Sequence, residues 1–393
     1  MSTDNTRAAA VDQDAAHKLD RHLAMLTMDR SNARLYRTCV DAAVSQRRFD
    51  VVVTLARERL AVEPAHASAL FDLATGLIGQ GEYRAALETL GGLNESAAAD
   101  AAVRFNKALC HYALREFDAA RPHLEYNYEQ GRHDAVALRL LASTYHHLGL
   151  LDEGLSIAKD HADAARGDAA LAGVYALLFF DADDIASATR NAETALRLDP
   201  KSIEGRIVRA AVLTMRAQMD RARDLLEGVL EDAPRNGRAW INLASLTLLD
   251  RDFVTARQQV ERGLETMPTH LGSWHLLAWT HLFAGDVDAA ERTFNHALEL
   301  DRTFGETHGA LAAIAAIKGE REKAERLRDV AMRLDPDGMS AHFAEAVLAG
   351  SAGDAEQARR ILTGAASQLE ARHGSALTKL LVRSATNAKP PAP

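Results

Sequence analysis

Histidines are the residues of this sequence whose chemistry must be considered first. The chain has 16 of them, and His146 and His147 are adjacent, so on a helix they point in different directions rather than toward one metal ion. His275 and His281 are six residues apart and fall on different faces of one predicted helix. These spacings predict packing or surface roles and no metal site.

The other reactive side chains also lack a catalytic arrangement. Asp183 and Asp184 fall in a predicted turn between helices, where solvated carboxylates are more common than acid–base pairs. Cys39 and Cys110 are far apart and without CxxC spacing, so we expect small buried hydrophobes. The sequence has no GxSxG elbow, no Gly-rich phosphate loop and no HExxH motif. We therefore predict a protein that is not an enzyme and needs no cofactor or metal.

Composition restricts the class of partner. The net charge of −9 argues against binding to the phosphate backbone of nucleic acids. No apolar run approaches the ~20 residues that span a bilayer, and the first residues do not resemble a secretory signal. We expect no nucleic-acid or membrane partner and a cytoplasmic location. Abundant alanine and a strong preference for arginine over lysine suggest a bacterial source.

The elements that position these side chains follow a period of 34 residues. Pro200, Pro234 and Pro268 stand 34 residues apart. Eighteen of the twenty residues at the eighth and twentieth places of the units are Ala or Gly, which keeps the units in phase. A fixed period of this length indicates stacked repeats. Extending it in both directions gives ten units, which begin at Ala33, Ala67, Ala101, Ala135, Ala169, Ile203, Gly237, Leu271, Gly305 and Met339.

Each unit is predicted to contain two helices. In the unit from Gly237 to Pro268, Trp240, Leu243 and Leu248 recur at helical spacing in the first half. A polar turn follows, and the second helix ends near a proline. Small residues in the two in-phase columns let the paired helices approach closely, because larger side chains there would overpack the crossing.

The pattern W-x2-L-A … A-x3-F-x2-A … P of Trp240, Trp274 and their in-phase neighbours resembles the tetratricopeptide repeat. The resemblance covers Ala33 to Glu370. It implies an all-α, right-handed α-solenoid of about ten such repeats with helical caps. First helices would line the concave face and second helices the convex face. It also implies a protein or peptide partner, because the family mostly binds these.

The chain is expected to divide by regularity. Gly91, Gly92 and Pro122 interrupt predicted second helices, so the repeats around them should be less regular. Apolar residues at helical spacing before and after the array predict capping helices. The expected divisions are a flexible segment and capping helix over 1–32, ten repeats over 33–370 (less regular over 67–168, regular over 169–370), a capping helix over 371–384 and a disordered tail over 385–393.

The candidate binding site is the concave side of repeats six to eight, whose first helices are apolar nearly all round. In a solenoid one face of such helices would be exposed, and large exposed apolar patches mark interaction sites. Trp279 is the strongest single candidate, since Trp is enriched among binding hot spots. The alternative is that these residues are core. The candidate partner-binding residues are Ile207, Met215, Ile241, Asn242, Leu248, Leu249, His275, Leu276, Trp279, Leu282 and Phe283.

One binding mode that the resemblance implies can be tested on the residues. Tetratricopeptide domains that hold a C-terminal carboxylate use five Lys, Asn and Arg residues over three repeats. Only Asn242 matches in repeats six to eight and only Asn106 in repeats two to four, so this clamp is not expected. The same face nearer the N-terminus is more polar and could accept acidic groups; it carries Arg34, Arg37, Asp41, Arg139 and His147.

The sequence thus predicts a non-enzymatic scaffold or adaptor that captures an apolar peptide or helix of a partner protein in the concave groove. Three alternatives stay open. The chain could be a regulator that senses peptides, although the residues before the first repeat are too few for a DNA-binding domain. It could be an enzyme whose repeats recruit substrate, although no stretch outside the array is long enough for a catalytic domain. It could also be a homo-oligomer that buries its own groove.

Overall fold

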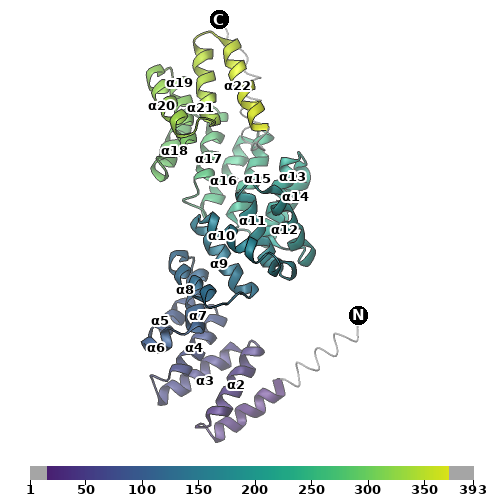
Figure 1. Cartoon of the computed structure of the whole chain (residues 1–393), viewed down its shortest axis with the longest axis vertical. Coiled ribbons are helices and arrows are strands. Elements are labelled where there is room, and N and C mark those ends of the chain that lie inside the picture. Colours follow the sequence, from purple (N-terminus) through teal and green to yellow (C-terminus); the bar gives the residue numbers. More distant parts are fainter. Residues whose placement is uncertain (1–15, 371–393) are drawn as a thin grey trace. The chain divides into compact units, whose positions relative to one another are not determined.

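The computed structural model describes the backbone of residues 16–370 and the side chains of residues 16–364, and this part of the chain contains helices and no strand (Figure 1). The helices form ten successive pairs, which confirms the predicted all-α repeat architecture. The first helices are α2 (Ala33–Ser45), α4 (Ala67–Gly79), α7 (Ala101–Ala113), α9 (Ala135–Leu148), α11 (Ala169–Asp181), α13 (Ile203–Met215), α15 (Gly237–Leu249), α17 (Leu271–Phe283), α19 (Gly305–Ile317) and α21 (Met339–Ser351). Each of them begins at the first residue of a predicted unit.

The second helices differ more in length than the first. They are α3 (Phe49–Val62), α5 (Tyr83–Gly91), α8 (Phe117–Glu129), α10 (Leu151–Asp160), α12 (Ile185–Leu198), α14 (Met219–Asp232), α16 (Phe253–Leu264), α18 (Val287–Leu300), α20 (Arg321–Leu334) and α22 (Ala355–Glu370). The short helix α6 (Glu95–Ala98) and the 3-10 helix η1 (Ala164–Gly167) both fall within 67–168, the stretch expected to be less regular. Pro122 is nevertheless accommodated inside α8.

Most first helices begin where a polar side chain caps the backbone. Asn32, Asp134 and Asn236 each accept a hydrogen bond from a backbone N–H in the first turn of the helix that follows. This bond satisfies a donor that has no partner within the helix. Because the cap recurs one residue before the unit boundary, local chemistry sets the register of the repeats.

The turn inside each repeat requires a left-handed backbone at one fixed place. The fifteenth residue of all ten units has a positive φ, whether or not it is glycine. Gly285 adopts φ 86° without steric cost, whereas Arg251 adopts φ 64° although its side chain disfavours that conformation. The turn geometry is therefore imposed by the packing of the two helices and not by glycine alone.

The chain divides into two compact units, Met1–Ala182 and Asp183–Pro393. The first unit contains α2 to α11 and the second contains α12 to α22. The boundary falls inside the fifth repeat, which the sequence period does not mark. We describe each unit by itself.

The core of the first unit begins before the first repeat. Residues 16–28 are helical, and Leu19 and Leu26 pack into one cluster with Tyr36, Cys39 and Val40. This helix covers the apolar edge of repeat one, as a cap of a repeat array must. The predicted C-terminal capping helix over 371–384, the tail over 385–393 and the first 15 residues lie outside the described residues. Within 16–370, no helix combines the length and apolar character needed to cross a membrane.

Candidate partner-binding face

The predicted binding residues lie together on α13, α15 and α17, but nearly half of them are core. Five of the eleven are buried, with at most 7% of their surface exposed: Ile207, Leu248, His275, Leu276 and Trp279. The other six are partly exposed: Met215, Ile241, Asn242, Leu249, Leu282 and Phe283. Side chains of the first group present too little surface to contact a partner, so only the second group can form a binding face.

Trp279 is the clearest correction to the sequence-based prediction. Its side chain is 1% exposed and packs against Phe283, Phe294 and Phe343, with ring centroids 5.8, 5.4 and 5.7 Å away. Phe343 belongs to α21, two repeats further along the chain. A helix that is apolar on every side is normally buried on every side. One side of α17 packs against its paired helix, and the first helices of later repeats bury the other side.

That cover depends on small residues in α19. All residues from Gly309 to Ala316 are buried. A Cβ built on Gly309 would lie 2.5 Å from the backbone N of Ala341 and 2.7 Å from the backbone C of Ser340, so the backbones of α19 and α21 are in direct contact. Only glycine permits this approach. The face formed by the first helices is therefore closed in repeats nine and ten.

His275 is another predicted binding residue that the structure places in the core. Its Nε2 lies 2.7 Å from the Thr307 hydroxyl of α19, and its ring meets Phe294 and Phe304 edge-on. Burial lowers the pKa of His275 to about 4, because a charged imidazole is poorly solvated among these rings. The neutral ring thus joins α17 to α19.

Most of the partly exposed residues are apolar and lie beside the core. Leu249 and Phe283 pack at the edge of the core cluster that contains Leu248 and Leu276. Phe283 also stacks on Phe253 of α16, with ring centroids 6.5 Å apart. We refer to the six residues Met215, Ile241, Asn242, Leu249, Leu282 and Phe283 as the α13–α17 face.

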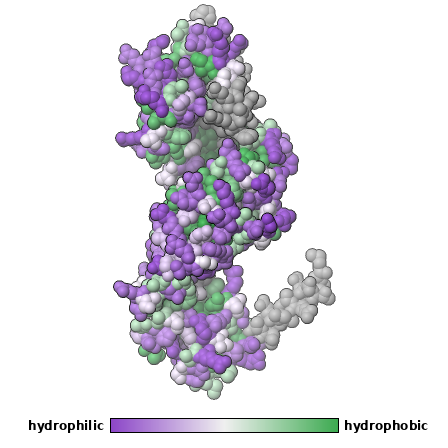
Figure 2. Space-filling model, viewed as in Figure 1, coloured by the Kyte–Doolittle hydropathy of each residue, from purple (hydrophilic) through white to green (hydrophobic). Residues whose placement is uncertain are grey.

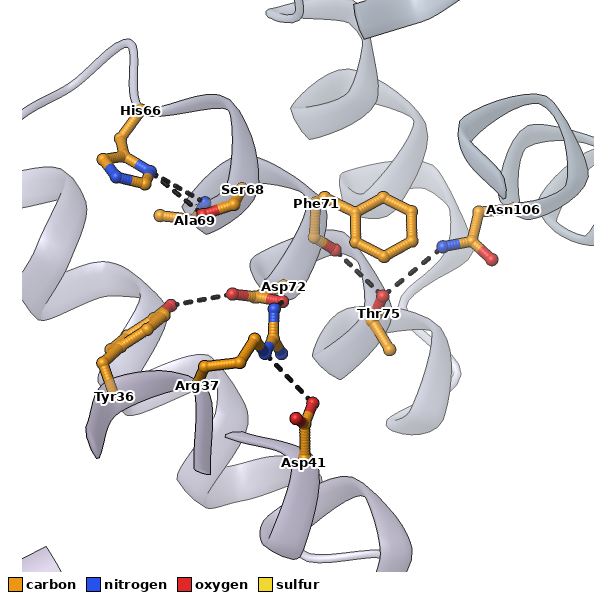
Figure 3. A network of polar contacts seen from close by, with 10 residues as sticks. All are labelled: Tyr36, Arg37, Asp41, His66, Ser68, Ala69, Phe71, Asp72, Thr75 and Asn106. Atoms are coloured by element: carbon orange, nitrogen blue, oxygen red, sulfur yellow. Dashed lines mark hydrogen bonds and ion pairs between the residues drawn. The ribbon is translucent and has the colours of Figure 1, made fainter. Parts of the chain in front are cut away.

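In the first unit, the corresponding face is polar and internally bonded (Figure 3). The Asp72 carboxylate is 2% exposed and accepts hydrogen bonds from the Tyr36 hydroxyl at 3.0 Å and from Arg37 Nη1 at 2.9 Å. Arg37 also pairs with Asp41, one helical turn along α2. Burial raises the pKa of Asp72, and the Arg37 guanidinium opposes that shift. The sequence pattern did not single out Asp72, because one acidic residue among apolar neighbours gives no signal by itself.

Similar polar contacts continue along the first helices of this unit. Asn106 donates to the Thr75 hydroxyl across 3.4 Å, which joins α7 to α4 (Figure 3). The hydroxyls of Tyr112 and Ser143 lie 2.7 Å apart and join α7 to α9. Arg37 and Asp41, expected to be available for acidic groups, are thus already paired with each other.

A cavity of about 580 Å³ opens at the N-terminal edge of the first unit. Leu23 and Leu26 of the first described helix, and Leu55 and Val62 of α3, supply apolar walls, and Arg59 lies at its polar side. Val62 is 87% exposed. Among the residues described, no group of three His, Cys, Asp or Glu side chains could hold a metal ion.

Comparison with known proteins identifies one repeat directly. Residues 271–304, which span α17 and α18, match the sequence profile of the family described as Tetratricopeptide repeat. These residues form a tetratricopeptide repeat. The other helix pairs keep its period, so the predicted resemblance is confirmed at the level of the repeat. A search of the curated proteins finds no match.

One solved structure supports the fold. The chain is similar to a crystal structure of the APC/C hetero-tetramer Cut9–Hcn1, with 13% identity over 96% of this chain and 82% of that chain and a TM-score of 0.57. Yeast Tom70 aligns with 16% identity over 98% of this chain and 94% of that chain at a TM-score of 0.39. Pseudomonas aeruginosa pilF aligns with 18% identity over 56% of this chain and 98% of that chain at a TM-score of 0.41. At these identities the first comparison supports the solenoid fold and leaves the partner open.

Proposed function

We propose that this protein is a non-enzymatic scaffold that holds an apolar peptide or helix of a partner protein against the α13–α17 face. A fold of stacked tetratricopeptide-like helix pairs supports protein interaction in general. The observation that carries the specific proposal is the partial exposure of Leu249, Leu282 and Phe283 on consecutive repeats. Apolar side chains at consecutive repeat positions fit the periodic anchors of an amphipathic helix.

The side of the molecule seen in Figure 2 shows hydrophobic residues reaching the surface among mainly hydrophilic ones. The partly exposed Asn242 amide lies within the face and offers a hydrogen-bonding group for a ligand backbone. Cys39 and Cys110 are both free and buried, as expected in a reducing compartment, and we propose that the protein works in the bacterial cytoplasm.

A photo-crosslinking experiment tests the proposal. A benzoylphenylalanine residue replaces Leu249 in the full chain, and a matched variant carries it at Val254, which is 63% exposed on the neighbouring helix α16. After irradiation in a lysate of the source organism, crosslinked peptides are sequenced by mass spectrometry. We expect position 249 to capture a defined apolar segment that position 254 does not. Identical crosslinks at both positions, or none at 249, would contradict the proposal.

Self-association is the second candidate, and the N-terminal edge favours it. Met28 is 90% and Val62 is 87% exposed, and Val62 borders the 580 Å³ cavity. Protruding apolar side chains beside a cavity can be self-complementary in a symmetric dimer. Light scattering of the full chain and of a Met28→Glu/Val62→Glu variant decides between a dimer at this edge and a monomer.

A further inference from the structure

Three ring side chains meet where the second helices of repeats three and four end. Tyr128 lies in the last turn of α8, His133 lies in the loop that leads to α9, and His161 directly follows α10. The His133 ring centroid lies 4.6 Å from that of Tyr128 and 4.7 Å from that of His161. The Tyr128 and His161 centroids are 5.6 Å apart. Nitrogen and oxygen donors from two repeats are thus gathered at one place.

The position of His161 explains why α10 is short. Repeats five to nine hold a small or β-branched residue at the corresponding place, buried inside the second helix: Ala195, Val229, Gly263, Ala297 and Ala331. An imidazole there would overpack the crossing of the helices. Helix α10 has ten residues, whereas α12 and α14 each have fourteen. The early end of α10 leaves the His161 ring at a helix terminus, beside Tyr128.

A hydrogen bond fixes which nitrogen of His133 carries the lone pair. Its Nε2 lies 3.0 Å from the backbone oxygen of Tyr128. A carbonyl oxygen only accepts, so Nε2 donates and the neutral ring keeps its lone pair on Nδ1. Within the described residues, no hydrogen bond to that Nδ1 is found. A histidine whose other nitrogen donates to a carbonyl is in the form that binds metal ions in proteins.

The Tyr128 hydroxyl and His161 Nε2 are spaced like two ligands of one ion, because they lie 3.0 Å apart. Two ligands at 2.0–2.1 Å from a metal, at roughly 90–110° to each other, are separated by about 2.9–3.4 Å. A metal ion can therefore replace the proton between these two atoms with little movement. Burial, together with the charge of the nearby His133, lowers the pKa of His161, so its ring is neutral at pH 7 and able to bind a metal.

The three side chains can be reached from solvent. His133 is exposed, and Tyr128 and His161 are partly exposed. An ion can therefore enter and keep water as its remaining ligands. The described residues contain no group of three His, Cys, Asp or Glu side chains suited to a metal, so the third protein ligand here is a tyrosine. The spacing of histidines in the sequence does not reveal such a set.

We propose that His133, His161 and Tyr128 bind a divalent transition-metal ion such as Zn(II). The ligands are His133 Nδ1, His161 Nε2 and the Tyr128 oxygen, and the hydroxyl proton of Tyr128 leaves to solvent when the ion binds. The bound ion connects the loop after α8 to the end of α10, and so joins repeats three and four. The proposal is independent of partner binding at the α13–α17 face.

Titration of the full chain with Cu(II) tests the site, because Cu(II) takes the same nitrogen and oxygen ligands as Zn(II) and binds them more tightly. We expect a visible charge-transfer band from the phenolate to the copper. Tyr128→Phe keeps the ring and should remove that band. His133→Gln and His161→Gln should each weaken Cu(II) binding by at least about tenfold. His296→Gln, at a half-exposed histidine of α18, is the matched control and should bind as the wild type does.

Zn(II) gives a second readout through stability. An ion that binds only the folded site should raise the melting temperature of the wild type and leave that of His133→Gln unchanged. Circular dichroism verifies that each variant is helical. A wild type without the charge-transfer band would overturn the proposal. So would equal Cu(II) affinity in the wild type, His133→Gln and His161→Gln, because the ion would then be held elsewhere in the chain. None of these outcomes bears on crosslinking at position 249.

Discussion

Neighbouring first helices of the first unit are joined by hydrogen bonds between side chains, whereas the last two first helices of the second unit also meet backbone to backbone. In the first unit, hydrogen bonds between side chains link α2 to α4 at Asp72, α4 to α7 at Asn106, and α7 to α9 at Tyr112. In the second unit, His275 and Thr307 link α17 to α19 in the same way, but α19 and α21 meet backbone to backbone at Gly309, and Trp279 fills the space beside them. The polar contacts of the first unit leave polar groups on the face of its first helices. Direct backbone contact between α19 and α21 closes the corresponding face at the end of the second unit.

This comparison explains which faces of the first helices remain available to a partner. A face closed by small residues, as on α19, can offer little to a partner. A face whose helices are linked by hydrogen bonds between side chains keeps exposed polar groups between those bonds. The α13–α17 face keeps partly exposed apolar side chains. The following substitutions test how much each of these contacts between helices contributes to the free energy of unfolding.

The largest loss of stability is expected from removing the buried Trp279 side chain. Trp279→Ala should lower the free energy of unfolding of the second unit by about 3–5 kcal/mol, since it leaves a cavity among three aromatic rings. Urea denaturation of the full chain measures the loss. Leu300→Ala, at a residue 37% exposed on α18, is the control and should cost much less. A Trp279 variant of unchanged stability would show that this side chain is not core.

Acid should weaken the same region through His275. Its pKa is lowered from 6.5 to about 4 in the folded state, so the stability it contributes above pH 6.5 is lost as the pH falls toward 4. The expected loss is roughly 3 kcal/mol at pH 4. His275→Gln should make unfolding less dependent on pH between 7 and 4, whereas His296→Gln, at a half-exposed histidine, should not. His123 contributes in the same pH range, so some dependence should persist in the variant.

Adding one methyl group at Gly309 should disturb the backbone contact between α19 and α21. Gly309→Ala places a Cβ against the Ala341 backbone, which cannot move aside cheaply, and should cost about 1–3 kcal/mol. Gly364→Ala, where a Cβ would meet nothing within 4 Å, is the helical control and should be neutral or slightly stabilising. Thermal unfolding of the two variants side by side gives the contrast. Equal melting temperatures would mean that α19 and α21 can separate without cost.

The smallest loss of stability is expected at the hydrogen bond between α7 and α9 in the first unit. Tyr112→Phe removes the hydroxyl that pairs with Ser143, which is 7% exposed, and should cost about 1 kcal/mol. Hydrogen exchange of the amides in α7 and α9 would detect the loss locally. Tyr83→Phe, at a hydroxyl with no hydrogen bond within residues 16–364, is the control. Unchanged exchange in both variants would show that the polar contact does not hold these helices together.

Much of the architecture follows from the sequence alone. The in-phase Ala and Gly columns and the capping residues before most units are local signals, because a small residue is required where paired helices cross and a polar cap satisfies the first turn of a helix. The period of the small columns gives the start of every first helix. The apolar nature of α13, α15 and α17 is equally local, and it is the signal from which the sequence predicts a binding face on these helices.

Tertiary structure alone decided which apolar side chains are exposed. Trp279 and Phe283 look alike in the sequence, yet Trp279 is buried because Phe343, 64 residues later, reaches it, while Phe283 stays at the edge. Asp72 and Lys107 show the same limit for polar groups. One is buried with two donors and the other has no partner in the described residues, although both lie on first helices. Burial depends on how closely successive repeats approach, and that distance is set by residues far away in the chain.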